Sequence, residues 1–144
     1  MRILIPLILA GLLAACSKPE APAPETTSAA PQETGLERIP EPDSSKFPHM
    51  QDMSSWKNPQ LVVREDGIGM VDIVNHEIHI LTQEQIPAEL ASLPQSAWPY
   101  GRAVLVTQAA PSDKSEQAKA KLRENRGLLV GTLKQLQVQI HEAP

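Results

Sequence analysis

Residues 60–81 read QLVVREDGIGMVDIVNHEIHIL, and this stretch decides the fold class of the chain. Short runs rich in Val and Ile predict strands, which we place at residues 60–65, 68–74 and 77–81. Asp66-Gly67 is a strong hairpin turn signal, and Asn75-His76 offers a second tight turn. Ile78 and Ile80 share one face of the third run, opposite His79 and Leu81, so we expect one of the two faces to lie against the core.

The C-terminal half alternates helical and extended patterns. Thr82 is expected to cap a short helix, and residues 102–107 are typical of a buried strand. Ser112 is a good amino-terminal cap for a second helix, whose leucines recur at helical spacing. Alternation over residues 136–141 then predicts a closing strand.

The predicted order is therefore β-β-β-α-β-α-β. Strands followed by alternating helices indicate an α+β fold, a small two-layer sandwich in which two helices cover one face of a mixed sheet of about five strands. We place this domain at residues 60–144. Its core is expected to consist of Leu, Ile and Val, because aromatic residues are only 3% of the 144.

Residues 17–59 are dominated by Pro, Ala, Glu, Ser and Thr, which predicts a disordered tether before the domain. Within it, residues 47–56 carry both tether aromatics and are expected to dock on the domain surface. His49, Met50 and Met53 are soft ligands that suit copper. No second cluster of ligands accompanies them, so we expect no metal site here. The sequence alone does not decide whether these three residues bind a metal.

The first sixteen residues have the features of an export signal. Met1-Arg2 is a positive start, and the apolar run over residues 3–13 is shorter than the ~20 residues that span a membrane. Leu13-Ala14-Ala15-Cys16 follows directly and contains the only cysteine. In these residues the chain resembles the bacterial lipoprotein family.

That resemblance implies that residues 1–15 are removed as a signal peptide and that Cys16 becomes the acylated amino terminus. The domain would then be anchored by lipid on the periplasmic side of the envelope, with residues 16–59 as the lipidated tether. In many members an Asp after the cysteine retains the protein in the inner membrane, so Ser17 favours the outer membrane and leaves the inner membrane open. An ordinary signal peptide with an incidental cysteine is the alternative.

Residues 60–143 resemble, in the order of their elements, the periplasmic domain of the Tol/Exb energy-transducing stator family. The similarity includes the Asp-Gly hairpin in residues 61–67, the short helix near Leu90 and the strand over residues 102–107. A stator also needs a membrane-spanning helix with a proton-titrating Asp, and residues 1–16 offer neither. The resemblance therefore implies a fold and not proton-driven work.

Composition and motifs argue against several functions. With 13 basic and 17 acidic residues, the net charge of −4 is unsuited to nucleic-acid binding, which needs a basic surplus. One cysteine excludes an internal disulfide and a multi-Cys metal site. His76 and His79 are three apart near a strand, where they would point to opposite faces and not chelate zinc. We find no catalytic or phosphate-binding motif and expect neither an enzyme nor a cofactor.

Two surfaces are candidates for binding. Trp98 and Tyr100 sit in a predicted loop, and large aromatics are favoured at interfaces, although the loop is equally compatible with a core plug. The second candidate is a basic stripe at helical spacing, formed by Lys119, Arg123 and Arg126. This stripe is more simply explained as a solvated helix face paired with Glu116 and Glu124.

We therefore predict a lipid-anchored periplasmic binding module without catalysis. Its partner would be an envelope protein, a target enzyme or peptidoglycan. The alternative is a structural accessory lipoprotein of a secretion, pilus or envelope complex.

Lipidation is the first prediction to test. Mass spectrometry of the mature protein should find acyl chains on residue 16 as the new amino terminus, and Cys16→Ser should abolish them because only the thiol accepts the lipid. A soluble, unacylated chain starting at residue 16 or 17 would contradict the lipoprotein interpretation.

Overall fold

Five strands form one mixed sheet in the computed structural model, which describes residues 35–72 and 74–143. The strands are β1 (Gln60–Arg64), β2 (Gly67–Val71), β3 (Ile78–Leu81), β4 (Ala103–Gln108) and β5 (Gln139–Glu142). Their order across the sheet is β3-β2-β1-β4-β5. β1 pairs antiparallel with β2 and β2 with β3, whereas β4 runs parallel to both β1 and β5.

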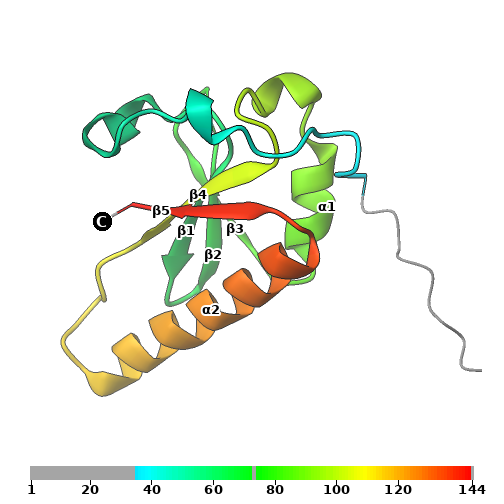
Figure 1. Cartoon of the computed structure of the whole chain (residues 1–144). Helices are drawn as coiled ribbons and strands as arrows, with labels where there is room; N and C mark the ends of the chain where they lie inside the picture. The colour runs from blue at the N-terminus through cyan, green and yellow to red at the C-terminus, as the bar shows by residue number, and fades with distance from the viewer. Residues whose placement is uncertain (1–34, 73, 144) are drawn as a thin grey trace, which may run out of the picture. The chain divides into compact units, whose positions relative to one another are not determined.

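Two helices, α1 (Gln85–Ser92) and α2 (Glu116–Gln135), connect the parallel strands. The β3–α1–β4 and β4–α2–β5 crossovers move in the same direction along the sheet. Since such crossovers share one hand, both helices must lie on the same face. In Figure 1, α2 lies below the sheet and the short turns over residues 44–55 lie above it. The predicted α+β sandwich with a five-stranded mixed sheet is confirmed.

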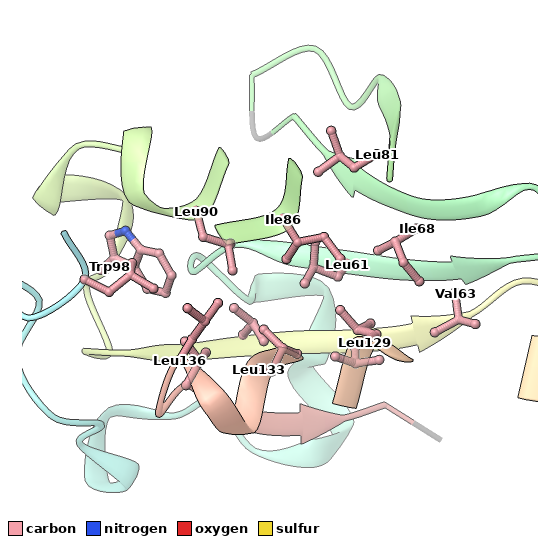
Figure 2. Packing of buried hydrophobic residues seen from close by; sticks show 14 of the residues in the cluster. Leu61, Val63, Ile68, Leu81, Ile86, Leu90, Trp98, Leu129, Leu133 and Leu136 are labelled. Carbon is pink, nitrogen blue, oxygen red and sulfur yellow. The ribbon is translucent and has the colours of Figure 1, made fainter. Parts of the chain in front are cut away.

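The core lies between this helical face and the sheet. Leu61 and Val63 of β1 are fully buried, and they face Ile86 of α1 together with Leu129 and Leu133 of α2, as Figure 2 shows. Strand β4 is buried on both of its faces, because Ala103 through Val106 are all at most 4% exposed. Aliphatic side chains dominate this core, as the composition predicted.

Local hydrogen bonds set the ends of both helices. The expected cap at Thr82 is wrong: Glu84 occupies the cap position of α1 without a side-chain cap hydrogen bond, and the backbone N–H of Thr82 donates to Gln85 Oε1 at 2.8 Å. The expected cap at Ser112 is wrong: Ser115 caps α2, accepting from the N–H of Ala118 at 3.1 Å. Ser112 lies too early because Asp113 accepts the N–H of Ser115 in a turn that precedes the helix.

The structure decides which face of β3 lies against the core, which the alternation of the sequence left open. Leu81 faces the core and is 7% exposed, whereas Ile78 and Ile80 are each 43% exposed on the opposite face. The cause is the register, which pairs Leu81 with the buried Ile68 and therefore fixes the face of every other residue in β3. Ile78 leans over Gly69 of β2, where a Cβ atom would collide with its Cγ2 methyl.

The expected domain boundary at residue 60 is wrong. Leu36 and Ile39 are at most 1% exposed and belong to the main core cluster. The same segment hydrogen-bonds the loop before β4, because Asp43 N–H donates to Tyr100 C=O at 2.9 Å and Arg102 N–H donates to Pro40 C=O at 2.8 Å. Residues 35–59 therefore belong to the folded unit, with Leu36 and Ile39 in its core. The predicted signal peptide, Cys16 and the tether up to residue 34 lie outside the described residues.

Leu36→Ala tests this new boundary. Leu36 is fully buried, so the substitution should lower the free energy of unfolding by about 2–5 kcal/mol. Leu128→Ala is the matched control, because Leu128 is 43% exposed and its truncation should cost much less. The two variants are compared by urea denaturation, and equal losses would place residue 36 outside the core.

Candidate binding surface

An apolar groove of about 600 Å³ lies at the end of the sheet where β2 passes to β3. Its walls come from three segments that are distant in the sequence: Pro59 before β1, Met70 and Val74 around the end of β2, and Leu93 and Ala97 after α1. This volume falls in the usual range of ligand sites, about 300–1,000 Å³. A side chain or an extended segment of a partner can therefore be received here.

The rim of the groove is polar and carries Lys57, Asp72 and His79. Asp72 Oδ1 accepts the N–H groups of Val74 at 2.7 Å and Asn75 at 3.1 Å. These two backbone hydrogen bonds, with a smaller contribution from the nearby histidines, hold the pKa of Asp72 below its usual value. The ionised carboxylate thus shapes the β2–β3 loop, which presents Val74 with 90% of its surface exposed.

The buried side chain of Asn58 connects the segment before β1 to the loop before β4 by hydrogen bonds. It is 2% exposed, and its amide nitrogen donates to the C=O groups of Gly101 at 2.7 Å and Ala103 at 2.8 Å. Its side-chain oxygen accepts the N–H of Tyr100 at 2.9 Å. Because its neighbours Lys57 and Pro59 line the groove, this buried amide positions that wall against the loop before β4.

Trp98 is not a surface contact. It is 3% exposed and belongs to the core cluster, and Figure 2 shows it at one end of the row of core side chains. Of the two interpretations of the loop, the structure therefore has the core plug at this residue. Within the described part of the chain, the indole N–H has no hydrogen-bond acceptor.

Tyr100 belongs to a second, smaller cluster of rings. Its centroid is 5.0 Å from that of Trp56, and Trp56 stacks on His141 of β5 at 5.4 Å and 15°. Phe47 meets Trp56 edge-on at 5.4 Å. The expected docking of residues 47–56 is confirmed by these contacts, and Tyr100 is half-buried in packing them rather than free to meet a partner.

The three residues of the basic stripe differ in their partners. Lys119 Nζ contacts Glu116 at 2.8 Å, as expected. Arg126 donates two hydrogen bonds of 2.7 Å to Glu142 of β5, and not to Glu124, because the crossover returns β5 beside the helix. Arg123 is exposed and has no ion pair among the described residues. Two of the three positive charges are thus neutralised, which makes the stripe a weak site for an anion.

The groove was not predicted from the sequence. Its residues belong to three segments with unrelated patterns, and only the crossover through α1 brings Leu93 and Ala97 beside Met70. One signal was available: Val74 is an aliphatic residue next to the Asn75-His76 turn, where burial is not required. Exposed apolar residues in turns are candidates for contact surfaces.

Comparisons with known proteins add no further site. No family model, no curated protein and no solved structure matches this chain. Across residues 35–72 and 74–143, no three His, Cys, Asp or Glu side chains are grouped so that they would hold a metal ion. In the same residues, no helix is both long and apolar enough to cross a bilayer.

Substitution of Trp98 tests its assignment to the core. Trp98→Ala should lower the free energy of unfolding by about 3–5 kcal/mol. Trp98→Phe should lower the free energy of unfolding clearly less, because it keeps an aromatic ring in the core and removes an indole N–H that has no acceptor among the described residues. Urea denaturation measures the stability of both variants. A Trp98→Ala variant as stable as the parent would contradict the assignment of Trp98 to the core.

Proposed function

We propose that this chain is a lipid-anchored binding module on the periplasmic side of the cell envelope, held by acylated Cys16. Its partner is an envelope protein that inserts an apolar segment into the groove. The module acts by binding and not by catalysis. The observation that carries this proposal is the groove itself, an apolar concavity with a polar rim.

The character of the groove favours a protein over peptidoglycan. Pro59, Met70, Val74, Leu93 and Ala97 offer carbon surface and few hydrogen-bonding groups. A glycan strand covered with hydroxyl and amide groups would lose water here without receiving partners in return. An apolar peptide segment gains from the same burial, at roughly 25 cal/mol per Å² of apolar surface.

The corrected boundary limits where the partner can be. With the packed unit beginning by residue 35, only residues 17–34 separate the proposed lipid site from the fold. Even fully extended, these residues reach no more than about 65 Å. The partner therefore lies close to the membrane that holds the lipid, which fits an envelope component.

Site-specific photo-cross-linking in cells tests this proposal. A photoreactive residue at Ser96, which lines the groove and is exposed, should form a discrete adduct with a partner protein. Ser54 is the matched control, since it is an exposed serine in the turn η2 (Met50–Ser55) outside the groove, and it should form no such adduct. A peptide from the cross-linked region is then titrated against Ser96→Glu and Ser54→Glu.

We expect Ser96→Glu to weaken peptide binding by about tenfold or more, the loss of roughly one apolar contact, while Ser54→Glu binds like the parent. Equal affinities would overturn the groove as the site. Sedimentation of both variants with isolated peptidoglycan, without a protein adduct, would instead support a glycan partner. A partner that co-purifies in fixed ratio without cross-linking would favour the structural accessory subunit.

A further inference from the structure

Strand β3 is an edge of the sheet, and no other strand of the described residues pairs with its outer side. Its own sequence lacks the usual protection against strand pairing. It is the last strand in the order β3-β2-β1-β4-β5, and its sequence Ile78–Leu81 contains no Lys, Pro or acidic residue. Ile78 and Ile80 are each 43% exposed. Exposed edges of this kind are templates for another strand, and natural sheets usually block them with charges, prolines or bulges. The opposite edge, β5, carries Glu142 paired with Arg126.

The backbone groups on the open side of β3 can be assigned. Asp72 N–H donates to Glu77 C=O at 2.8 Å, so the C=O of Glu77 points toward β2. In an antiparallel ladder the direction alternates with every residue. His79 and Leu81 therefore also point toward β2, and Ile78 and Ile80 direct their N–H and C=O groups outward.

These outward groups are complementary to a second copy of themselves. A two-fold axis perpendicular to the sheet pairs two β3 strands antiparallel and keeps the helical face of both copies on the same side. Residues that lie directly opposite each other must then point to the same face, which requires the axis to pass through a residue and not between two residues. With the axis at His79, Ile78 of each copy lies opposite Ile80 of the other. All four outward groups of each strand are then used, in four hydrogen bonds.

The neighbouring registers fail because their partners are already engaged. An axis at Ile80 would pair Ile78 with Thr82, whose N–H donates to Gln85 Oε1 and whose C=O accepts from Gln85 N–H. An axis at Ile78 would pair Ile80 with His76, whose N–H donates to Asp72 C=O in a turn with φ of 59°. Only the register centred on His79 leaves no outward group unpaired.

The side chains agree with this register. Ile78 and Ile80 of both copies would form one apolar cluster on the face opposite the helices, continuous with Gly67 and Gly69 of β2, over which these isoleucines lean. Glu77 of each copy would lie opposite Leu81, so no two like charges face each other directly. We infer that β3 is a homodimer interface, in which two copies pair antiparallel about His79 to make a continuous ten-stranded sheet.

The pairing is expected to be weak in dilute solution. Two short strands and four isoleucines bury less than the roughly 1,000 Å² of a stable interface. This step rests on the proposed lipid anchor: two copies held on one membrane are concentrated relative to each other, which favours such a contact. The interface is therefore best measured with the full chain in its membrane.

Cysteine cross-linking reads the register directly. Residues in a non-hydrogen-bonded antiparallel pair have Cα atoms about 4.5 Å apart, which suits a disulfide. His79→Cys in membranes of cells making the full chain should give, on oxidation, about tenfold more dimer than Ile80→Cys, whose two copies would lie beyond the ~7 Å limit. Gln139→Cys on β5 is the control for the other edge of the sheet. The parent chain, whose only cysteine is Cys16, measures any disulfide dimer that forms through that residue.

A second substitution tests the isoleucine contact. Ile80→Lys added to His79→Cys should reduce the cross-linked dimer by about tenfold, because a charge enters the paired edge. Leu128→Lys, at the same 43% exposure but on α2, should leave it unchanged. Equal yields for His79→Cys, Ile80→Cys and Gln139→Cys would overturn the inference. An adduct whose mass is not twice that of the chain would also overturn it, in favour of a foreign strand.

Discussion

The buried amide of Asn58 is the interaction on which the rest of this structure depends. At 2% exposure, it satisfies two carbonyl groups and one N–H of residues 100–103 with hydrogen bonds of 2.7 to 2.9 Å. Through it the segment before β1 is fixed to the start of β4. The core plug at Trp98, the ring cluster around Tyr100 and the Pro59 wall of the groove all flank this one contact. A buried polar group with all of its partners specifies one arrangement where apolar packing alone would allow several.

The two faces of the sheet are treated differently. The helices cover one face except at the groove, whereas the turns over residues 44–55 bring the ring cluster to β5 on the other face and bury Leu105 of β4. On the half of that face formed by β2 and β3, Ile78 and Ile80 remain partly exposed and lie over Gly69 and Gly67. Covering the β4–β5 side and leaving the β2–β3 side open concentrates exposed apolar surface at one end of the molecule. The groove and the free edge both lie there and share His79.

This shared residue links the two proposals. In the inferred dimer the His79 side chains meet at the two-fold axis on the helical face, so the two grooves would lie next to each other across it. A partner with two apolar segments would then bind one dimer at both sites, and each site would raise the effective concentration at the other. A lipid anchor on each copy would orient the pair toward the same membrane.

The sequence by itself determined the order of the strands and helices and the fold class, because hydrophobic periodicity and the Asp66-Gly67 turn are local properties of the chain. It did not set their ends, since the closing strand expected over residues 136–141 is β5 at Gln139–Glu142. It did not determine that Leu36 and Ile39 enter the core, since two apolar residues among prolines and charges have no periodicity to detect. Nor could it orient β3, where alternation places isoleucines on one face but only pairing with β2 decides which face meets the helices. The groove is the clearest case: its three segments have no common pattern, and the crossover through α1 and the clamp at Asn58 bring them together. Long-range pairing and buried hydrogen bonds decided these features, and neither is encoded in any single stretch of residues.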